Sequence, residues 1–317
     1  MRRGQVIGAL GRVLLGAGTL ILLFVAYQLW GTELVESHSQ AVLRNEFNHE
    51  LRRARTTVGS TTATPTTSVP APSGKADPAP TTAAPAEGMP VGVIEIPRIG
   101  LNKVIVEGTS TTDLRQGPGH YLGTPLPGQA GNAAIAGHRT TYGAPFYNLN
   151  NLSDGDDIVI TTTQGTFTYT VVRHFTVPCG GVSCNDPADS AVLTQSTSPE
   201  LTLTTCNPPF AATSRLIVQG DLTAARVNPG ATGTLTTRPP ASRSGAESNA
   251  LAGDQGDWLP ALWWGAGLVA AAVAVWLVAR RRPRRIRRLL FGLGGVGVLV
   301  VLFFFFGAVS PLLPASF

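Results

Sequence analysis

Charged residues are scarce in this chain of 317 residues: Asp, Glu, Lys and Arg make up 14% of it, against 43% hydrophobic residues. Such an apolar composition indicates membrane segments before any motif is considered. Basic residues are also lacking where a nucleic acid would need them. Seven arginines lie in one cluster at 280–288, and residues 91–225 contain six Lys or Arg against ten Asp or Glu. Without a basic face to neutralise phosphates, the chain is not predicted to bind nucleic acid, despite its net charge of +5.

A signal-peptide cleavage site is missing as well. The first apolar run, residues 6–30, follows two arginines and is long enough to cross a bilayer, which takes about 20 residues. A cleaved signal peptide is the alternative, but the run is long for that role and no A-x-A-like site closes it. Tyr27 and Trp30 stand where interfacial aromatics would anchor a retained helix. We therefore predict a transmembrane signal anchor at residues 1–30.

Two later apolar runs, residues 258–279 and 289–313, are also predicted to be transmembrane helices. The arginine cluster at 280–288 lies in the loop between them, and loops rich in Lys and Arg stay in the cytoplasm. The basic N-terminus requires the same side. Both conditions hold only if residues 31–257 lie on the extracellular side of the membrane. The sequence thus predicts a multi-pass protein of the cell membrane with an extracellular central domain.

The segments that flank this central domain differ in composition. Residues 31–55 are rich in charge, and we predict a juxtamembrane helix there. Residues 56–90 are almost all Thr, Ala, Pro and Ser, so they cannot bury enough apolar surface to fold and are predicted to be a disordered tether. Residues 226–257 are predicted to be a second linker, before the second span.

The central domain, residues 91–225, is predicted to be mainly β. It consists of short runs rich in β-branched residues, which Gly, Pro, Asn and Asp separate as turns require. Short helices are expected only near 111–116, 145–151 and 187–195. This pattern predicts a closed or nearly closed β-barrel with small helical insertions.

The chain has only three cysteines, and no C-x-x-C pair of a thiol–disulfide enzyme. Cys179 and Cys184 lie in a Gly-rich loop outside the membrane, where disulfides persist, and their spacing allows a bridge without establishing one. Cys206 is left over. A lone cysteine at a strand end is by default a buried, inert residue. Here, however, the strand gives way to Asn207-Pro208-Pro209, so the thiol could face a groove.

Two residues could make the thiol of Cys206 reactive. Arg215 opens the next predicted strand nine residues later, so the hairpin would bring it close, where it could favour the thiolate or an oxyanion. Alternatively, Arg215 is a surface cation at the end of a strand. A nucleophilic cysteine also needs a proton-transfer partner, usually histidine. His138 follows an apolar strand and a glycine, which suits a barrel rim and matches Cys206, whereas His120, in G-P-G-H-Y, has no assigned role.

Three of these segments, in this order, resemble the signature of the sortase family. They are A-x-A-G-H-R around His138, T-L-x-T-C ending at Cys206, and an arginine nine residues later. The order distinguishes them from papain-like and some cell-wall peptidases, which place the cysteine before the histidine. The resemblance covers roughly 92–222. The sequence segments at 117–121, 127–129 and 140–149 look most like those of class E sortases of high-GC Gram-positive bacteria.

The resemblance implies an eight-stranded β-barrel and a cysteine transpeptidase, a thiol protease-type acyl transferase with no cofactor and no metal. Cys206 would be the nucleophile, His138 the acid and base, and Arg215 the residue that holds substrate and stabilises the oxyanion. Tyr121 and Thr205 are predicted to bind substrate. For Thr205, which stands beside the thiol, an ordering role and a plain strand position remain alternatives.

The substrate implied by the resemblance is a surface protein with a C-terminal LAxTG- or LPxTG-like sorting motif. Cleavage would fall between Thr and Gly, and the protein would be joined to a cell-wall precursor amine of the lipid II kind. Class C sortases often carry a lid with an Asp-Pro-aromatic motif, but here Asp77-Pro78 is followed by Ala79, so no aromatic plug is predicted. The alternative function is a catalytically silent β-barrel interaction module tethered to the membrane.

Overall fold

The computed structural model describes residues 3–58, 76–178, 193–210, 213–228, 258–280 and 282–310. These residues fall into two compact units. The helical unit holds the described residues of Met1–Thr32 and Gly253–Pro314, and the barrel unit holds those of Glu33–Ala252. We describe each unit by itself.

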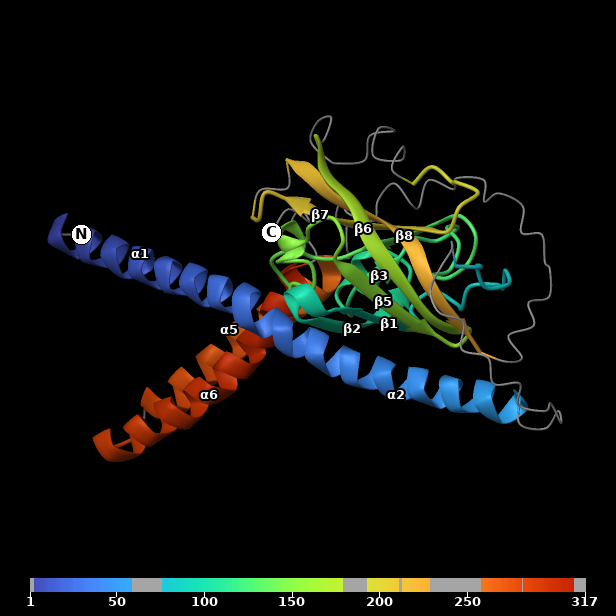
Figure 1. Ribbon diagram of the computed structural model, residues 1–317. Helices are drawn as coiled ribbons and strands as arrows, with labels where there is room; N and C mark the ends of the chain where they lie inside the picture. The colour runs from blue at the N-terminus through green and yellow to red at the C-terminus, as the bar shows by residue number, and fades with distance from the viewer. Residues whose placement is uncertain are drawn as a thin grey trace. The chain divides into compact units, whose positions relative to one another are not determined.

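Among the described residues, eight strands close into a barrel in the order β1-β2-β3-β4-β7-β8-β6-β5 (Figure 1). The predicted eight-stranded β-barrel is therefore confirmed. The strands are β1 (Pro90–Ile96), β2 (Leu101–Glu107), β3 (Gly119–His120), β4 (Asn132–Ala136), β5 (Asp157–Thr162), β6 (Gly165–Pro178), β7 (Glu200–Asn207) and β8 (Ser214–Val227).

Alternation of side chains forms the barrel core, as the first half of β6 illustrates. Phe167, Tyr169 and Val171 point inward and are buried, while the threonines between them are half-buried. This period of two is that of a strand with one face on a core. The backbone amide of Gly128 donates a hydrogen bond of 2.6 Å to the Tyr169 hydroxyl, which satisfies that polar group inside the core. Burial raises the pKa of Tyr169, so the phenol stays neutral.

The directions of the strands determine which strand ends lie together in the barrel. β4 pairs with β7 in parallel, and β7 pairs with β8 antiparallel. The last residues of β4 and β7 and the first residues of β8 therefore lie at one end of the barrel. That end is where the residues after Ala136, the residues around Cys206 and Arg215 come together.

The short helices follow the predicted positions in part. α3 (Thr111–Leu114) is capped by Ser110 and Asp113, whose side chains bond each other's backbone amides. The 3-10 turn η3 (Leu149–Asn151) lies within the second predicted stretch. The part of the third stretch that the structure describes, 193–195, is not helical. A further 3-10 turn, η2 (Pro97–Ile99), was not predicted. It ends at Gly100 in the left-handed region, at φ 67°.

Part of the predicted tether packs on the barrel. Residues 59–75 lie outside the described residues, but Ala79 is only 4% exposed and its amide donates to Gly128 O at 2.7 Å. Gln164 Nε2 donates to Pro80 O at 2.7 Å. The segment 76–89 thus differs from the predicted tether, because these hydrogen bonds and the buried side chain of Ala79 attach it to the barrel. It lies beside the residues that precede β4, at the opposite end of that strand from His138.

The helix α2 (Thr32–Val58) lies where the juxtamembrane helix was predicted. Its apolar side packs on the outer surface of β1 and β2. The buried cluster there consists of Leu43, Phe47, Val93, Val104 and Val106. A charged helix with a narrow apolar stripe is the pattern that covers one side of a sheet.

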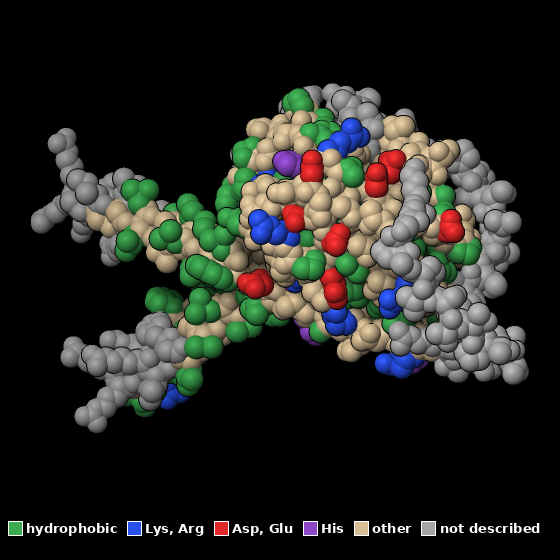
Figure 2. All heavy atoms as spheres, in the orientation of Figure 1, with side chains coloured by type: hydrophobic (Ala, Val, Ile, Leu, Met, Phe, Trp, Pro, Cys, Tyr) green, Lys and Arg blue, Asp and Glu red, His purple; other side chains and the backbone are tan. Residues whose placement is uncertain are grey.

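The helical unit contains α1 (Arg3–Ala26), the π-helical turn η1 (Tyr27–Gly31), α5 (Trp258–Arg280) and α6 (Arg284–Val309). In the described part of the chain, two helical stretches are long and apolar enough to cross a membrane, Leu14–Ala54 and Trp258–Arg280. Leu293–Val309 is a shorter apolar helix. Figure 2 shows hydrophobic side chains along these helices, and Asp and Glu spread over the barrel. Large apolar side chains that face outward, such as Leu15 and Trp263, are typical of helices in contact with lipid.

Candidate active site

The register of β4 against β7 brings His138 and Cys206 to the same level. Ala136, the last residue of β4, is paired with Thr204 in a parallel ladder. His138 and Cys206 each lie two residues further along, His138 just beyond the end of β4 and Cys206 near the end of β7. The structure therefore places the predicted base and the predicted nucleophile at one rim of the barrel.

Thr205 fastens the turn that presents His138. Its hydroxyl donates a hydrogen bond of 2.7 Å to the carbonyl oxygen of Gly137, and the amide of Gly137 bonds Thr204 O at 3.1 Å. The Thr205 side chain is only 1% exposed and points into the barrel. A buried hydroxyl of this kind is not placed to touch substrate. The geometry favours the ordering role for Thr205 over the predicted substrate-binding role.

Cys206 and Arg215 form a cross-strand pair. They are register partners in the β7–β8 hairpin, and Arg215 Nη1 donates to Cys206 Sγ at 2.8 Å. Arg215 is 5% exposed, whereas Cys206, a free cysteine among the described residues, is partly exposed. A buried guanidinium strongly favours negative charge on a neighbouring atom, because little water screens it. The guanidinium can thus stabilise an oxyanion formed beside the sulfur.

His138 is held in its neutral form. Burial of the ring, and then the positive charges of Arg115 and Arg215, lower the pKa of His138 to about 4. Part of the residue remains accessible at the surface. Its ring packs on that of Tyr142, with 5.2 Å between centroids and 36° between planes. At neutral pH this imidazole is a proton acceptor, as a general base must be.

Tyr121 lies on the same outer face of the barrel as the thiol. Its hydroxyl is 3.0 Å from Thr204 Oγ1, and Thr204 precedes Cys206 by two residues on β7. Residues two apart on a strand share a face. Tyr121 is half-buried beside the predicted nucleophile, a position that can line a substrate groove.

Arg139, like Arg115 and Tyr142 around His138, has no role predicted from the sequence. Its guanidinium, in a side chain only 5% exposed, donates from Nη1 to Cys206 O at 3.0 Å and to Asn207 Oδ1 at 2.6 Å. Nη2 donates to Asn150 Oδ1 at 2.9 Å. Burial lowers the pKa of Arg139, and its Nε has no partner among the described residues. The available signal was its place directly after His138 in the A-x-A-G-H-R motif.

His120 is a structural residue. It is fully buried, with Nδ1 2.8 Å from Glu107 Oε2 and Nε2 2.9 Å from Pro125 O. Thr124 Oγ1 is 3.0 Å from the same Nε2. Both ring nitrogens are therefore occupied, and the ring is not available to a reacting group.

Cys179 and Cys184 fall in the stretch 179–192, outside the described residues, so their possible disulfide stays a prediction. In the part of the chain that is described, no group of three or more His, Cys, Asp or Glu side chains is arranged to hold a metal ion.

Comparison with known proteins bears on these residues. The family model of the sortase domain matches residues 94–223. Over 222 residues the chain is 33% identical to sortase SrtE1 of Streptomyces coelicolor, an alignment that covers 68% of this chain and 56% of that one. Sortase E from Streptomyces avermitilis is 38% identical, with 46% of this chain and 98% of that chain covered and a TM-score of 0.38. This chain belongs to the sortase family.

The resemblance noted from its motifs is thus confirmed, including the likeness to class E enzymes. Sortase D of Bacillus subtilis is another relative, 36% identical over 122 residues, which is 38% of this chain and 56% of that one. The chain spans 56% of the length of each of these two curated relatives. The sortase domain contains His138, Cys206 and Arg215.

Proposed function

We propose that this protein is a membrane-anchored sortase, a cysteine transpeptidase that cleaves a C-terminal LAxTG- or LPxTG-like motif between Thr and Gly. The observation that carries the proposal is the 2.8 Å contact from Arg215 Nη1 to Cys206 Sγ, at the rim to which β4 also brings His138. A thiol, a neutral imidazole and a buried cation are the groups that acyl transfer through a thioester requires.

The first half-reaction acylates Cys206. His138 takes the thiol proton as the sulfur attacks the carbonyl carbon of the motif threonine, so that a C–S bond forms and negative charge develops on oxygen. Arg215, with its buried guanidinium, stabilises that charge. The C–N bond to glycine then breaks, and His138 returns the proton to the departing amine. The products are a thioester on Cys206 and a free C-terminal fragment.

The second half-reaction releases the enzyme. A primary amine attacks the thioester carbon, a new C–N bond forms, and the C–S bond breaks. His138 takes a proton from the attacking amine and passes it to the sulfur of Cys206, so the starting state is restored. Water in place of the amine would give hydrolysis instead of transfer.

The proposed setting is the cell membrane, with several spans and the catalytic domain outside. The apolar helices α1 and α5 support anchoring, and the arginine cluster at 280–288 supports the orientation. In that setting the partners are surface proteins that carry a C-terminal sorting signal, and the acceptor is a cell-wall precursor amine of the lipid II kind.

A peptide screen with the full-length protein in detergent micelles tests this function. Fluorogenic peptides with LAxTG, LPxTG and scrambled motifs are incubated with and without a small primary amine, and products are identified by mass. We expect cleavage between Thr and Gly and a new amide when the amine is present. Wild-type protein that leaves both motifs intact, or that cuts the scrambled peptide equally well, would overturn the proposal.

A further inference from the structure

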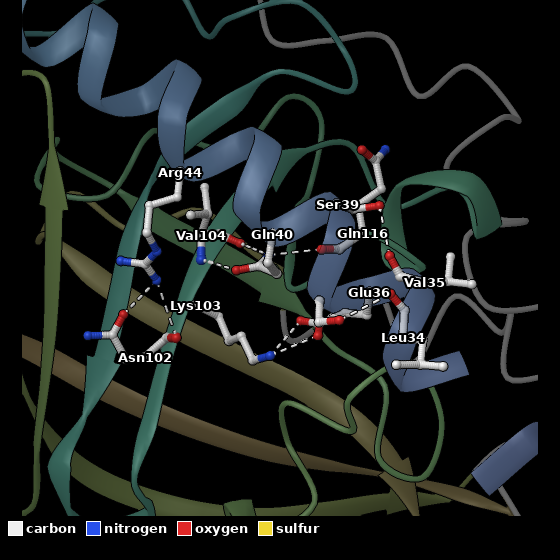
Figure 3. Close-up of polar contacts among 11 residues, drawn as sticks. Leu34, Val35, Glu36, Ser39, Gln40, Arg44, Asn102, Lys103, Val104 and Gln116 are labelled. Carbon is white, nitrogen blue, oxygen red and sulfur yellow. Dashed lines mark hydrogen bonds and ion pairs between the residues drawn. The ribbon is translucent and has the colours of Figure 1, made fainter. Parts of the chain in front are cut away.

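Gln40 of α2 closes an open edge of the barrel (Figure 3). Within the described residues, β3 pairs with β2 only at Val106 and Glu107, which leaves the backbone of Val104 without a strand partner on that side. The amide of Gln40 takes this place: Val104 N donates to Oε1 at 2.7 Å, and Nε2 donates to Val104 O at 2.9 Å. The same Nε2 donates to Gln116 O at 2.8 Å. Because Gln40 is buried, loss of this amide would leave several polar groups unpaired.

The residue before Gln116, Arg115, connects this contact to the active site. Arg115 places its guanidinium carbon 5.6 Å from the centroid of the Tyr142 ring, in a cation–π arrangement. Gly117, on the other side of Gln116, lies so close to Gln40 Nε2 that a Cβ there would collide with it. The turn 115–117 therefore packs closely on α2, and it holds the Arg115 guanidinium over the Tyr142 ring.

Glu36 of α2 reaches the second segment, the loop 142–144. Its carboxylate is fully buried and pairs with Lys103 Nζ at 2.7 and 2.8 Å. A Cβ at Gly143 would lie 2.7 Å from Glu36 Oε2, so only glycine allows the loop to approach so closely. Tyr142, Gly143 and Ala144 all have positive φ, at 51°, 69° and 40°. Two non-glycine residues in this region are strained, and such strain persists only when neighbouring structure holds it in place.

Both contacts converge on one aromatic ring. Gln40 bonds the turn that carries Arg115 over the Tyr142 ring, and the Glu36 carboxylate lies against Gly143 in the strained loop that carries Tyr142 itself. That ring packs on His138 at 5.2 Å between centroids. We propose that helix α2 is a positioning element of the active site, which holds the Tyr142 ring against His138. The inference rests on the proposed function, since it concerns the base of that reaction. None of the α2 residues is itself catalytic.

The same helix supplies a matched control. Arg44, one turn beyond Gln40, donates to Asn102 Oδ1 at 2.7 Å and so also ties α2 to β2 (Figure 3). It touches neither the turn 115–117 nor the loop 142–144 through any described hydrogen bond. Arg44→Gln removes a contact between helix and barrel without disturbing the path to Tyr142.

The test is a double-mutant cycle in the full-length protein, with Gln40→Met and Tyr142→Asn as single changes. Asparagine tolerates positive φ, so Tyr142→Asn removes the ring without adding strain. Each single change should lower kcat for peptide cleavage about 10- to 100-fold with KM within about 2-fold, as expected for a misplaced catalytic group. Because Gln40 acts through Tyr142, the double variant should be no slower than Tyr142→Asn alone. Arg44→Gln should keep wild-type kcat.

A second readout is independent of turnover. Nuclear magnetic resonance of histidine-labelled protein follows the His138 ring, assigned with His138→Gln. The ring is faced by the cations Arg115 and Arg215, by the Tyr142 phenol and, through the register, by the Cys206 thiol. Gln40→Met should shift the His138 resonance and its titration in the wild-type background, and should have no further effect in the Tyr142→Asn background.

The outcomes separate this inference from the proposed function. A wild-type protein that cleaves no sorting peptide but shows the coupled His138 shifts refutes the function and keeps the positioning role. Multiplicative losses of kcat in the double variant, or an unchanged His138 resonance in Gln40→Met, overturn the positioning role. If Gln40→Met does not fold, Glu36→Gln enters the same cycle, with the same expected and contradicting results.

Discussion

Arg139 Nη1 lies 3.0 Å from the carbonyl oxygen of Cys206, so the residue after the proposed base holds the backbone of the proposed nucleophile. The bond joins the end of β4 to the end of β7, two segments that are far apart in sequence. It therefore holds the residue after His138 against the backbone of Cys206.

Substitution of Arg139 by lysine should show whether its positive charge alone stabilises the fold or whether its hydrogen-bond geometry is needed. Arg139→Lys keeps the positive charge but loses the planar fork that serves Cys206 O, Asn207 and Asn150 together. We expect a loss of about 2–4 kcal/mol of unfolding free energy, since buried acceptors are left unpaired. Thermal and denaturant unfolding measure it. Arg173→Lys, an exposed arginine on β6, is the control and should change stability by less than about 0.5 kcal/mol.

Thr205 should tolerate serine and not valine. Thr205→Val keeps the shape but leaves the buried carbonyl of Gly137 without its donor, which costs about 1–3 kcal/mol of stability. Because that carbonyl belongs to the residue before His138, kcat for peptide cleavage should fall while KM changes little. Thr205→Ser keeps the hydroxyl and should retain most of the activity. A Thr205→Val protein with wild-type kcat would show that the hydrogen bond does not order the site.

Removal of the three proposed catalytic groups should abolish the reaction without unfolding the protein. Cys206→Ala should give no cleavage of a sorting peptide, and His138→Ala and Arg215→Ala should each lose about 10³-fold or more in kcat/KM if the groups act as a unit. Circular dichroism and unfolding curves check that the barrel persists. An active His138→Ala would exclude that residue as the base.

Alkylation reports on the thiol directly. Mass spectrometry after iodoacetamide treatment of native protein should show modified Cys206, because the residue is partly exposed beside Arg215. Arg215→Ala should slow this modification, since the guanidinium that donates to Cys206 Sγ is lost. An unreactive Cys206 in the wild-type protein would contradict the proposed nucleophile.

The pKa of His138 makes a prediction for stability as well as for rate. The pKa is about 4 in the folded chain, against an ordinary value of 6.5, so the unfolded chain binds more protons between these two pH values. Unfolding free energy should therefore fall as pH drops from 6.5 towards 4, by at most about 3 kcal/mol, and His138→Gln should remove this slope. Denaturant titrations across this pH range measure it.

Arg115 sets part of that pKa. Arg115→Gln removes one of the two charges that lower the pKa of His138, so the acid limb of the pH–rate profile should move to higher pH. Arg173→Gln, which removes a charge from the exposed part of β6, should leave the limb unchanged. Identical profiles for the two variants would contradict the assigned electrostatics.

The parts of the site that could be predicted are those set by local sequence. Cys206 and Arg215 flank one short hairpin, so a strand, a loop and a returning strand already bring them together. The barrel itself followed from alternating β-branched runs and turn residues. His138 was predicted because a strand that ends in glycine releases its next residue at a rim.

The remaining features depend on contacts between distant segments. Periodicity does not reveal that Ala136 pairs with Thr204, and without that register the direction of Thr205 cannot be assigned. The buried position of Arg139 was equally hidden, since an arginine is usually exposed. Composition predicts a tether over the segment 76–89, because it does not reveal backbone hydrogen bonds such as that from the amide of Ala79 to Gly128 O.

The two-residue length of β3 limits how far this chain can be shortened from its N-terminal side. A fragment that starts at residue 76 would lack α2, and its barrel would have a bare β2 edge at Val104 and an uncovered apolar surface at Val93 and Val106. Exposed edges and apolar patches of this kind promote aggregation. The smallest autonomous folding unit should therefore be discontinuous, with residues 33–54 of α2 retained alongside residues 76–228.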